Sequence, residues 1–190
     1  MLVNLQASIR QILIGDILFI VCCGFYLAWW LVAFRINDPI KGIRSGWLLI
    51  PAAIAGVAAV VLIIQGMNAT KPEHTLFPGI AFVVGGIIAY VVLAVVTVLA
   101  FKRPMTSELL LFVGWGALTL AQVNTLHGAG QLAASLSWIL VAVIILFVAA
   151  SLVCYVLFYR LPPQPAFIDG MIPLILVALS MAGLSVCIVV

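Results

Sequence analysis

Ionisable side chains are rare in the apolar runs of this sequence, and the few that occur are the first residues to consider for chemistry. Asp16, Glu108, His127 and Asp169 fall within such runs or at their ends. Burying a charge in lipid is costly, so each is a candidate functional residue. Glu108 and Asp169 lie in the first turn of an expected helix, where a carboxylate meets the positive helix end, and we interpret both as structural caps. Asp16 and His127 remain as candidates for binding or proton transfer.

The fourth apolar run carries further polar residues at helical spacing. Trp115, Thr119 and Gln122 follow spacings of four and three, which puts them on one side of a helix. Asn124 and His127, three apart, form a second polar stripe. Because a lipid-facing helix would not carry such groups, we expect them to face a water-filled pocket or polar partners on a neighbouring helix.

The predicted ligand-binding site consists of Trp115, Thr119, Gln122, Asn124, His127 and Asp16. A few polar groups among apolar walls suit an amphipathic organic solute better than a bare ion. Strong ion coupling is not expected, and a coupled proton would have to be carried by Asp16 or His127. The alternative is structural: the polar groups bond to other helices, and the sequence HGAG at 127–130 is only an outer turn.

Composition places this site in a membrane. Of 190 residues, 67% are hydrophobic and 7% are charged, and the mean hydropathy is +1.40. Soluble domains are about half apolar and about a quarter charged, so the sequence predicts an all-α integral membrane protein with the lipid bilayer as its surroundings. No room is left for a soluble catalytic or nucleic-acid-binding domain. The net charge of +3 is too small and too dispersed to indicate nucleic acid as a partner.

Six apolar runs are long enough to cross a bilayer, since each crossing takes about 20 apolar residues. Short loops rich in proline, glycine and charge separate them, which predicts a compact bundle of six transmembrane helices in one domain over residues 1–190. The expected helices cover residues 11–34, 46–66, 77–101, 108–126, 133–159 and 169–190. Residues 2–11 alternate apolar and polar types, so this start is expected to lie along the membrane interface before the first helix turns in.

Lysine and arginine are unevenly distributed between the loops. The first, third and fifth loops hold Arg35, Lys41, Arg44, Lys102, Arg103 and Arg160, whereas the other side holds Arg10 and Lys71. The positive-inside rule then places the odd-numbered loops in the cytoplasm and both termini outside, with the plasma membrane as the expected location. In this topology Asp16 and His127 share the outer half, where they could approach one another.

The three basic loops are alike. Each opens with an aromatic residue and a base, contains proline, and precedes a helix that begins at a capping residue. These are Ser45, either Thr106 or Ser107, and Asp169. One interpretation is three parallel two-helix hairpin repeats around an axis along the membrane normal. The alternative is that inner loops of membrane proteins commonly share these features.

Small residues also recur four apart within the expected helices. The pairs are Ala52 with Gly56, Ala55 with Ala59, Gly85 with Ala89, and Ala178 with Ala182. This spacing lets helix backbones approach closely, because lipid supplies no hydrophobic drive between helices. The pattern supports a compact bundle and allows association with a second copy or with a partner membrane protein.

No catalytic motif is found. The sequence shows no Ser/His/Asp or Cys/His arrangement, no glycine-rich phosphate loop and only two histidines, so neither an enzyme, a metal site nor a cofactor is expected. The cysteines Cys22, Cys23, Cys154 and Cys187 all lie within apolar runs, and we interpret them as packing residues.

Two functions are consistent with this sequence. The leading hypothesis is a small-solute transporter, or the membrane-embedded solute-binding subunit of one, with its pocket on the outer half of the fourth helix. The alternative is a non-catalytic scaffold, sensor or accessory subunit that docks another membrane protein through its small-residue helix faces. In that case, substitutions at Gly56 or Gly85 should release the partner.

Overall fold

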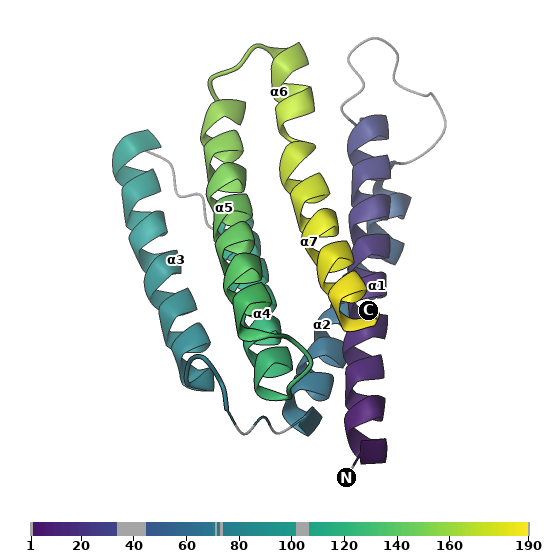
Figure 1. Ribbon diagram of the computed structural model, residues 1–190. Coiled ribbons are helices and arrows are strands. Elements are labelled where there is room, and N and C mark those ends of the chain that lie inside the picture. Colours follow the sequence, from purple (N-terminus) through teal and green to yellow (C-terminus); the bar gives the residue numbers. More distant parts are fainter. Residues whose placement is uncertain (1, 34–44, 71, 73, 102–106, 190) are drawn as a thin grey trace. The chain divides into compact units, whose positions relative to one another are not determined.

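The computed structural model describes residues 2–33, 45–70, 72, 74–101 and 107–189, and no strand occurs among them (Figure 1). The helices are α1 (Leu2–Ala33), the 3-10 turn η1 (Ser45–Leu48), α2 (Leu49–Thr70), α3 (Gly79–Phe101), α4 (Ser107–Gly128), α5 (Ala134–Phe158), α6 (Pro163–Asp169) and α7 (Ile172–Val189). The predicted all-helical class is therefore confirmed. The predicted helix boundaries agree within a few residues, apart from the start of α1 and the additional helix α6.

Five helical segments are long and apolar enough to cross a membrane. They lie at Leu5–Ala33, Gly46–Thr70, Gly79–Leu99, Ala134–Phe158 and Pro163–Val189. Helix α4 has 22 residues but is not among the five. The side chains of its first three residues, 107–109, lie outside the described part of the chain. A sixth crossing through α4, and a bundle that unites all six helices, stay predictions.

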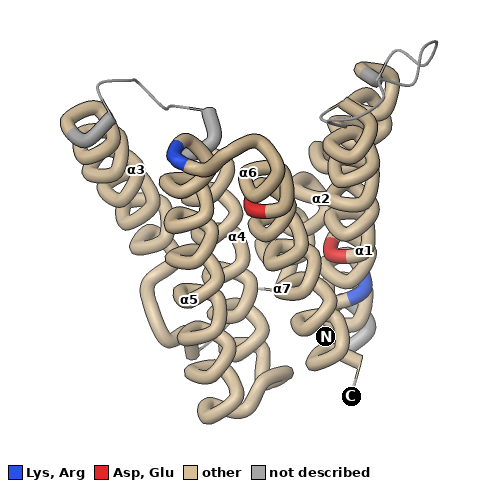
Figure 2. Tube along the Cα trace, turned by 90° about the horizontal axis from the view of Figure 1, so that it is seen from above, with Lys and Arg blue, Asp and Glu red and all other residues tan. Residues whose placement is uncertain are grey.

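Charged residues are sparse in the described part of the chain (Figure 2). Where side chains are described, the charged residues are Arg10, Asp16, Arg160 and Asp169. Five of the six bases of the predicted cytoplasmic loops, together with Lys71, lie outside the described residues, and so does the side chain of Glu108. The sidedness of the loops and termini therefore stays a prediction, as does the cap at Glu108.

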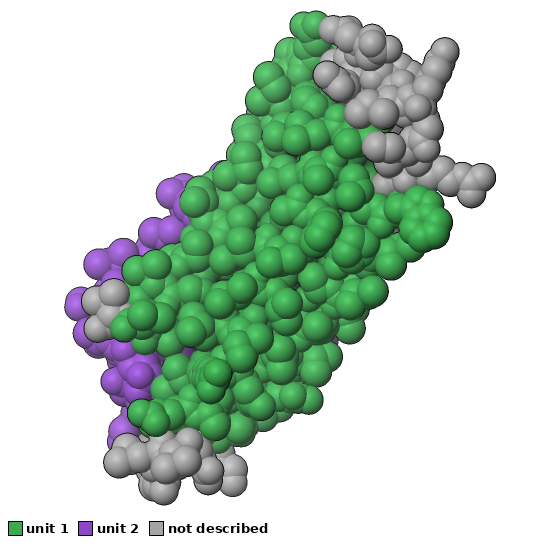
Figure 3. Space-filling view, turned by 90° about the vertical axis from the view of Figure 1, so that its right-hand side faces the viewer, with its two compact units in different colours: residues 1–71, 153–190 green, residues 72–152 purple. Residues whose placement is uncertain are grey.

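The chain divides into two compact units (Figure 3). Unit 1 comprises residues 1–71 and 153–190, and unit 2 comprises residues 72–152. Helix α5 contributes its first part to unit 2 and its last turns to unit 1. A single domain and the three-hairpin repeat both concern how these parts are arranged together, and they stay predictions.

Unit 1 is built on close packing of α1 against α2. A Cβ atom added to Gly15 would lie 2.6 Å from Ile63 Cγ1, and one added to Gly66 would lie 2.6 Å from Ile12 Cγ1. At Gly56 the added atom would lie 3.1 Å from Cys22 Sγ. These pairs descend along α2 as they ascend along α1, so the helices are antiparallel. Glycine is needed here because the backbones nearly touch.

The first helix is unbroken from Leu2 to Ala33. The prediction that residues 2–11 lie along the interface and then turn is therefore wrong. The physical reason lies in packing: Ser8 and Ile12 are buried, and both pack against Gly66 of α2. The start of α1 thus belongs to the same helix contact as the rest of it.

Trp30 joins α1 to α6 and to the glycine that follows it. The indole N–H of Trp30 donates a hydrogen bond of 3.0 Å to the backbone oxygen of Phe167 in α6. Its ring lies so close to Gly170 that a Cβ at that position would collide with it. Helix α7 then buries Val177, Met181 and Leu184, which follow helical spacing.

Unit 2 contains α3, α4 and the first part of α5. Gly86 of α3 faces Ala117 and Val113 of α4, and Gly116 of α4 faces Val148 of α5. Nearer the helix ends, Phe77 is bonded to Asn124 of α4, and His127 of α4 contacts Ser137 of α5. Each neighbouring pair of helices is therefore antiparallel. The rest of α3 is exposed on nearly all sides, with large apolar residues such as Ile80 and Leu99 at the surface.

Candidate functional site

Two of the polar residues on α4 satisfy their hydroxyl groups within the helix. Thr119 donates a hydrogen bond of 2.7 Å to the carbonyl of Trp115, and Thr125 donates one of 2.8 Å to the carbonyl of Ala121. Both are bonds to the residue four positions earlier, the usual way in which a helix accommodates a buried threonine. Thr119 is fully buried and does not present its hydroxyl hydrogen to a ligand.

Asn124 fixes the segment that leads into α3. Its side-chain oxygen accepts a hydrogen bond of 2.9 Å from the backbone N–H of Phe77, and its amide nitrogen donates one of 3.0 Å to the backbone oxygen of Phe77. The amide therefore pairs with both backbone polar groups of Phe77, as a residue of a neighbouring antiparallel β-strand would. An asparagine side chain has two N–H donors and two acceptor lone pairs, so one of each remains.

His127 closes the turn between α4 and α5. Its Nδ1 lies 3.2 Å from the carbonyl of Leu132 and 3.2 Å from Oγ of Ser137, while Ser137 Oγ lies 3.0 Å from the carbonyl of Ala133. All three contacts are satisfied together only if Nδ1 carries the proton and the serine donates to Ala133. The neutral ring then leaves Nε2 as its acceptor.

Trp115 and Gln122 lie in the interior. Gln122 is fully buried and Trp115 is 5% exposed. The indole Nε1 of Trp115 has no hydrogen-bond partner within the described residues. Gly116, beside it, is filled by Val148 of α5, whereas Gly114 has open space at its Cβ position. The two glycines that flank Trp115 thus differ: one is in contact with α5 and the other is not.

Asp16 belongs to α1 in unit 1 and is fully buried. His127 belongs to unit 2, so the expected approach of the two side chains concerns two separate units and stays a prediction. The predicted set of six residues is therefore divided, with five on α4 and one on α1.

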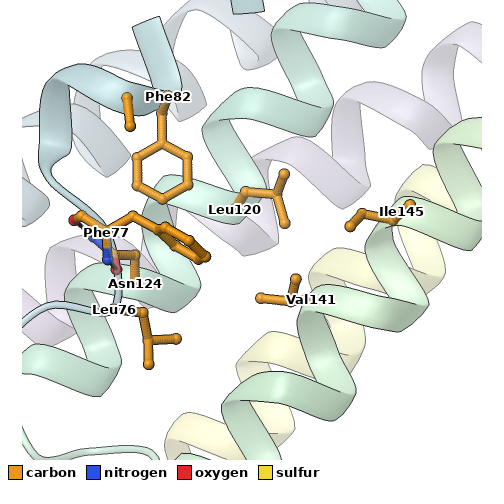
Figure 4. Close-up of a pocket in the computed structure, with 8 residues that line it drawn as sticks. Leu76, Phe77, Phe82, Leu120, Asn124, Val141 and Ile145 are labelled. Atoms are coloured by element: carbon orange, nitrogen blue, oxygen red, sulfur yellow. Dashed lines mark hydrogen bonds between the residues drawn. The ribbon is translucent and has the colours of Figure 1, made fainter. Parts of the chain in front are cut away.

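A pocket of about 240 Å³ lies within unit 2, among α3, α4, α5 and the segment before α3 (Figure 4). We call it the α3–α4–α5 pocket. Its lining consists of Leu76, Phe77, Ala81, Phe82, Leu120, Asn124, Val141 and Ile145. Within the described part of the chain, Asn124 is its one polar lining residue. The pocket is about half open, and apart from Asn124 it is bounded by aromatic and aliphatic side chains.

The structure places only one of the predicted residues, Asn124, at this pocket. Trp115, Thr119, Gln122 and His127 do not line it. The walls are instead made by apolar residues that sequence reasoning did not select, because leucine, valine and isoleucine occur throughout this chain. A signal that could have indicated the pocket is the pair Phe77 and Phe82, flanking Pro78 and Gly79 at a helix start.

The position of Asp169 also differs from the prediction. It is the last residue of α6 and does not begin α7, so the predicted cap is wrong. The prolines at 162 and 163 start α6 early, since proline is well accommodated in the first turn of a helix. The Asp169 carboxyl is 7% exposed, contacts the thiol of Cys154, and has no hydrogen-bond partner at Oδ2 among described residues.

No group of three or more histidine, cysteine or acidic residues that could hold a metal ion occurs within the described residues. Comparison with family models, curated proteins and solved structures found no match. A function for this chain must therefore rest on its own residues and their geometry.

Proposed function

We propose that this chain is a multi-pass integral membrane protein that binds a small organic solute in the α3–α4–α5 pocket. The observation that carries the proposal is the pocket itself: an open-sided cavity with apolar walls and a single amide, Asn124, on its surface. Ligand sites are mostly apolar, with a small number of placed polar groups that set orientation. The proposed class is a solute transporter or the solute-binding subunit of one.

Membrane insertion is supported by the apolar surface of the helices as well as by their length. Ile54 and Val57 on α2, Val83 and Ile87 on α3, and Ile139 on α5 each expose more than half of their surface. In water such a surface would drive aggregation. In a bilayer it faces acyl chains at no cost, which agrees with five helices of sufficient length and apolarity.

The remaining polar residues of α4 have a supporting role in this proposal. Thr119 and Thr125 bond within α4, and His127 holds the turn to α5. Asn124 joins α4 to the segment before α3 while it also lines the pocket. Loss of this pairing would let Phe77 move, and Phe77 forms part of the pocket wall.

A membrane docking subunit is the second candidate, and one observation favours it. Gly85 of α3 has nothing within 4 Å of its Cβ position and is exposed, as is Ala89 one turn further along. This small-residue pair is available for close approach of another helix. Gly56 is not available in this way, because it packs against Cys22 of α1.

The test of solute binding is thermal unfolding of the purified protein in lipid nanodiscs against a panel of small solutes. A ligand at about 100 times its Kd should stabilise the folded state by roughly 2.7 kcal/mol. The shift should disappear in Ala81→Leu, which fills the pocket, and persist in Ala149→Leu, which makes the same change at an exposed position of α5 outside the pocket lining. A panel that shifts neither the parent nor the control would count against the proposal.

The docking candidate is tested separately by subunit counting in dilute nanodiscs. Association that is present in the parent, lost in Gly85→Leu and retained in Gly114→Ala would favour it. A monomer at every protein-to-lipid ratio would remove self-association, and co-purification of the parent and the Gly85→Leu variant with the same partner would remove the Gly85 face.

A further inference from the structure

We infer that the solute of the α3–α4–α5 pocket is a single-chain amphiphile with a neutral hydroxyl-bearing head group, which reaches the pocket from the bilayer. This inference rests on the proposed function and names its ligand class. It is carried by four observations: where the pocket opens, how large it is, what charge it lacks and where its one amide lies.

The open side of the pocket adjoins an apolar surface. Ile145, on the α5 wall, is 55% exposed, and Phe77, at the start of α3, is 39% exposed. Beside the α3 wall, Ile80 and Val83 are 71% and 62% exposed. A molecule at this opening therefore touches the surface that, in a membrane, faces lipid chains. Lateral access from the bilayer involves no transfer of the alkyl chain through water.

The volume suits a chain better than a rigid multi-ring solute. About 240 Å³ is below the range of roughly 300–1,000 Å³ typical of pockets for drug-sized ligands. Along α4 the pocket extends from Asn124 to Leu120, and along α5 from Val141 to Ile145, each about 6 Å at 1.5 Å per residue. A narrow apolar space of this length accommodates part of an alkyl chain, and the rest of the chain can extend through the open side.

The lining favours an uncharged head group. No charged side chain is among the residues that line the pocket in the described part of the chain. Asn124 keeps one N–H and one lone pair after pairing with Phe77, so it can both donate to and accept from a hydroxyl. A charged head would have to remain outside in water, because burial of an unpaired charge is costly.

The amide also lies at the correct end of the pocket for a head group. Asn124 is four residues from the end of α4, and Phe77 precedes the first turn of α3. The Phe77 ring contacts Trp138 edge to face, at 5.9 Å between centroids, and Trp138 is 52% exposed near the start of α5. Tryptophan at a helix end is typical of the membrane interface, where the head groups of amphiphiles lie.

The test uses a long-chain alcohol that carries a diazirine on its alkyl chain, incorporated into phosphatidylcholine nanodiscs with the intact protein. After irradiation, the labelled residues are mapped by mass spectrometry. We expect label on residues 76–82 and 120–124, reduced roughly tenfold in Ala81→Leu, because a filled pocket excludes the chain. Label in Ala149→Leu, at an exposed position of α5 outside the pocket lining, should match the parent. Circular dichroism and thermal midpoints of the variants show whether each is folded.

Competition separates the ligand class from the function. Protection of residues 76–82 by monoolein, supplied in the bilayer, and not by indole, supplied from water, would support the inference. Protection by indole and not by monoolein would overturn the amphiphile and leave solute binding standing. Label that is equally strong in the parent and in a folded Ala81→Leu variant would remove the pocket as the site, and with it both the inference and the proposed function.

Discussion

The α1–α2 and α3–α4 pairs are both antiparallel, yet they pack in different ways. On α2, the buried residues Ala52, Ala55, Ala59, Ile63 and Gly66 form one stripe, and the exposed residues Ile50, Ile54, Val57, Val61 and Ile64 form the opposite one. Helix α3 has no such division: large apolar residues are exposed around most of its circumference. The α1–α2 pair is thus in continuous close contact, whereas the α3–α4 pair leaves space for a pocket beside it.

The glycines explain much of this difference. Gly15 and Gly66 lie where α1 and α2 approach so closely that no residue with a Cβ atom fits. On α3, Gly86 makes ordinary contact with α4, while Gly85 faces open space. Unit 2 relies instead on side-chain hydrogen bonds to backbone groups near its helix ends, through Asn124 and His127. A stripe of small residues therefore predicts a possible contact, and only the structure shows which stripe is used.

The largest effect we predict separates these two kinds of glycine. Gly66→Leu should lower the free energy of unfolding by about 3 kcal/mol, because the new side chain meets Ile12 and the carbonyl of Ser8 at 2.9 Å from its Cβ position. Gly85→Leu, with nothing within 4 Å, should leave stability nearly unchanged. Reversible unfolding in mixed detergent micelles measures both.

Equal destabilisation by the two substitutions would break the comparison, since it would mean that the open face of α3 is filled in the folded protein. A self-associated state would produce that result, so the measurement is made at several protein-to-detergent ratios. Gly24→Ala, in α1 with open space at its Cβ position, reports the effect of a glycine change away from the α1–α2 contact.

A smaller effect is expected when the hydrogen bonds between Asn124 and Phe77 in unit 2 are removed. Asn124→Ala deletes two hydrogen bonds and leaves the backbone N–H and C=O of Phe77 without these partners, which should cost about 1–3 kcal/mol. It should also weaken solute binding, because Phe77 is part of the pocket wall. Unfolding and the nanodisc solute assay measure the two consequences.

The exposed residue Asn68 supplies the control, as Asn68→Ala removes the same side chain from a surface position on α2. If Asn124→Ala and Asn68→Ala were equally stable, the bond to Phe77 would contribute little to stability. The contact between α3 and α4 would then be held mainly by apolar packing.

Helix positions followed from the sequence because apolar runs of this length have few alternatives. The small helix α6 did not, since LPPQP reads as a loop unless the prolines happen to start a helix. Polar spacing on α4 was recognised, but spacing cannot distinguish a threonine that bonds four residues back from one that faces a ligand. Thr119 and Thr125 prove to be of the first kind.

The candidate site was predictable only through Asn124. An asparagine within an apolar helix signals a specific polar partner, though not whether that partner is solute or backbone. The apolar walls gave no signal, because Leu120, Val141 and Ile145 differ in nothing from dozens of neighbours until tertiary packing leaves a space between them. The residue type alone therefore cannot show which apolar side chains line a cavity.

The smallest effect concerns the turn between α4 and α5, where the hydrogen bonds assign a tautomer to His127. With Nδ1–H donating to Leu132 and Ser137 donating to Ala133, nitrogen NMR of labelled histidine should show the Nδ1-protonated ring at a pH where the imidazole is neutral. Ser137→Ala should cost only about 1 kcal/mol and keep this tautomer, because the carbonyl of Leu132 still accepts. A switch to Nε2–H in that variant would mean that the serine, and not the backbone, sets the ring. The hydrogen bonds of His127 at the turn between α4 and α5 would then depend on the Ser137 side chain. The close contact of α1 with α2 depends instead on the approach of their backbones.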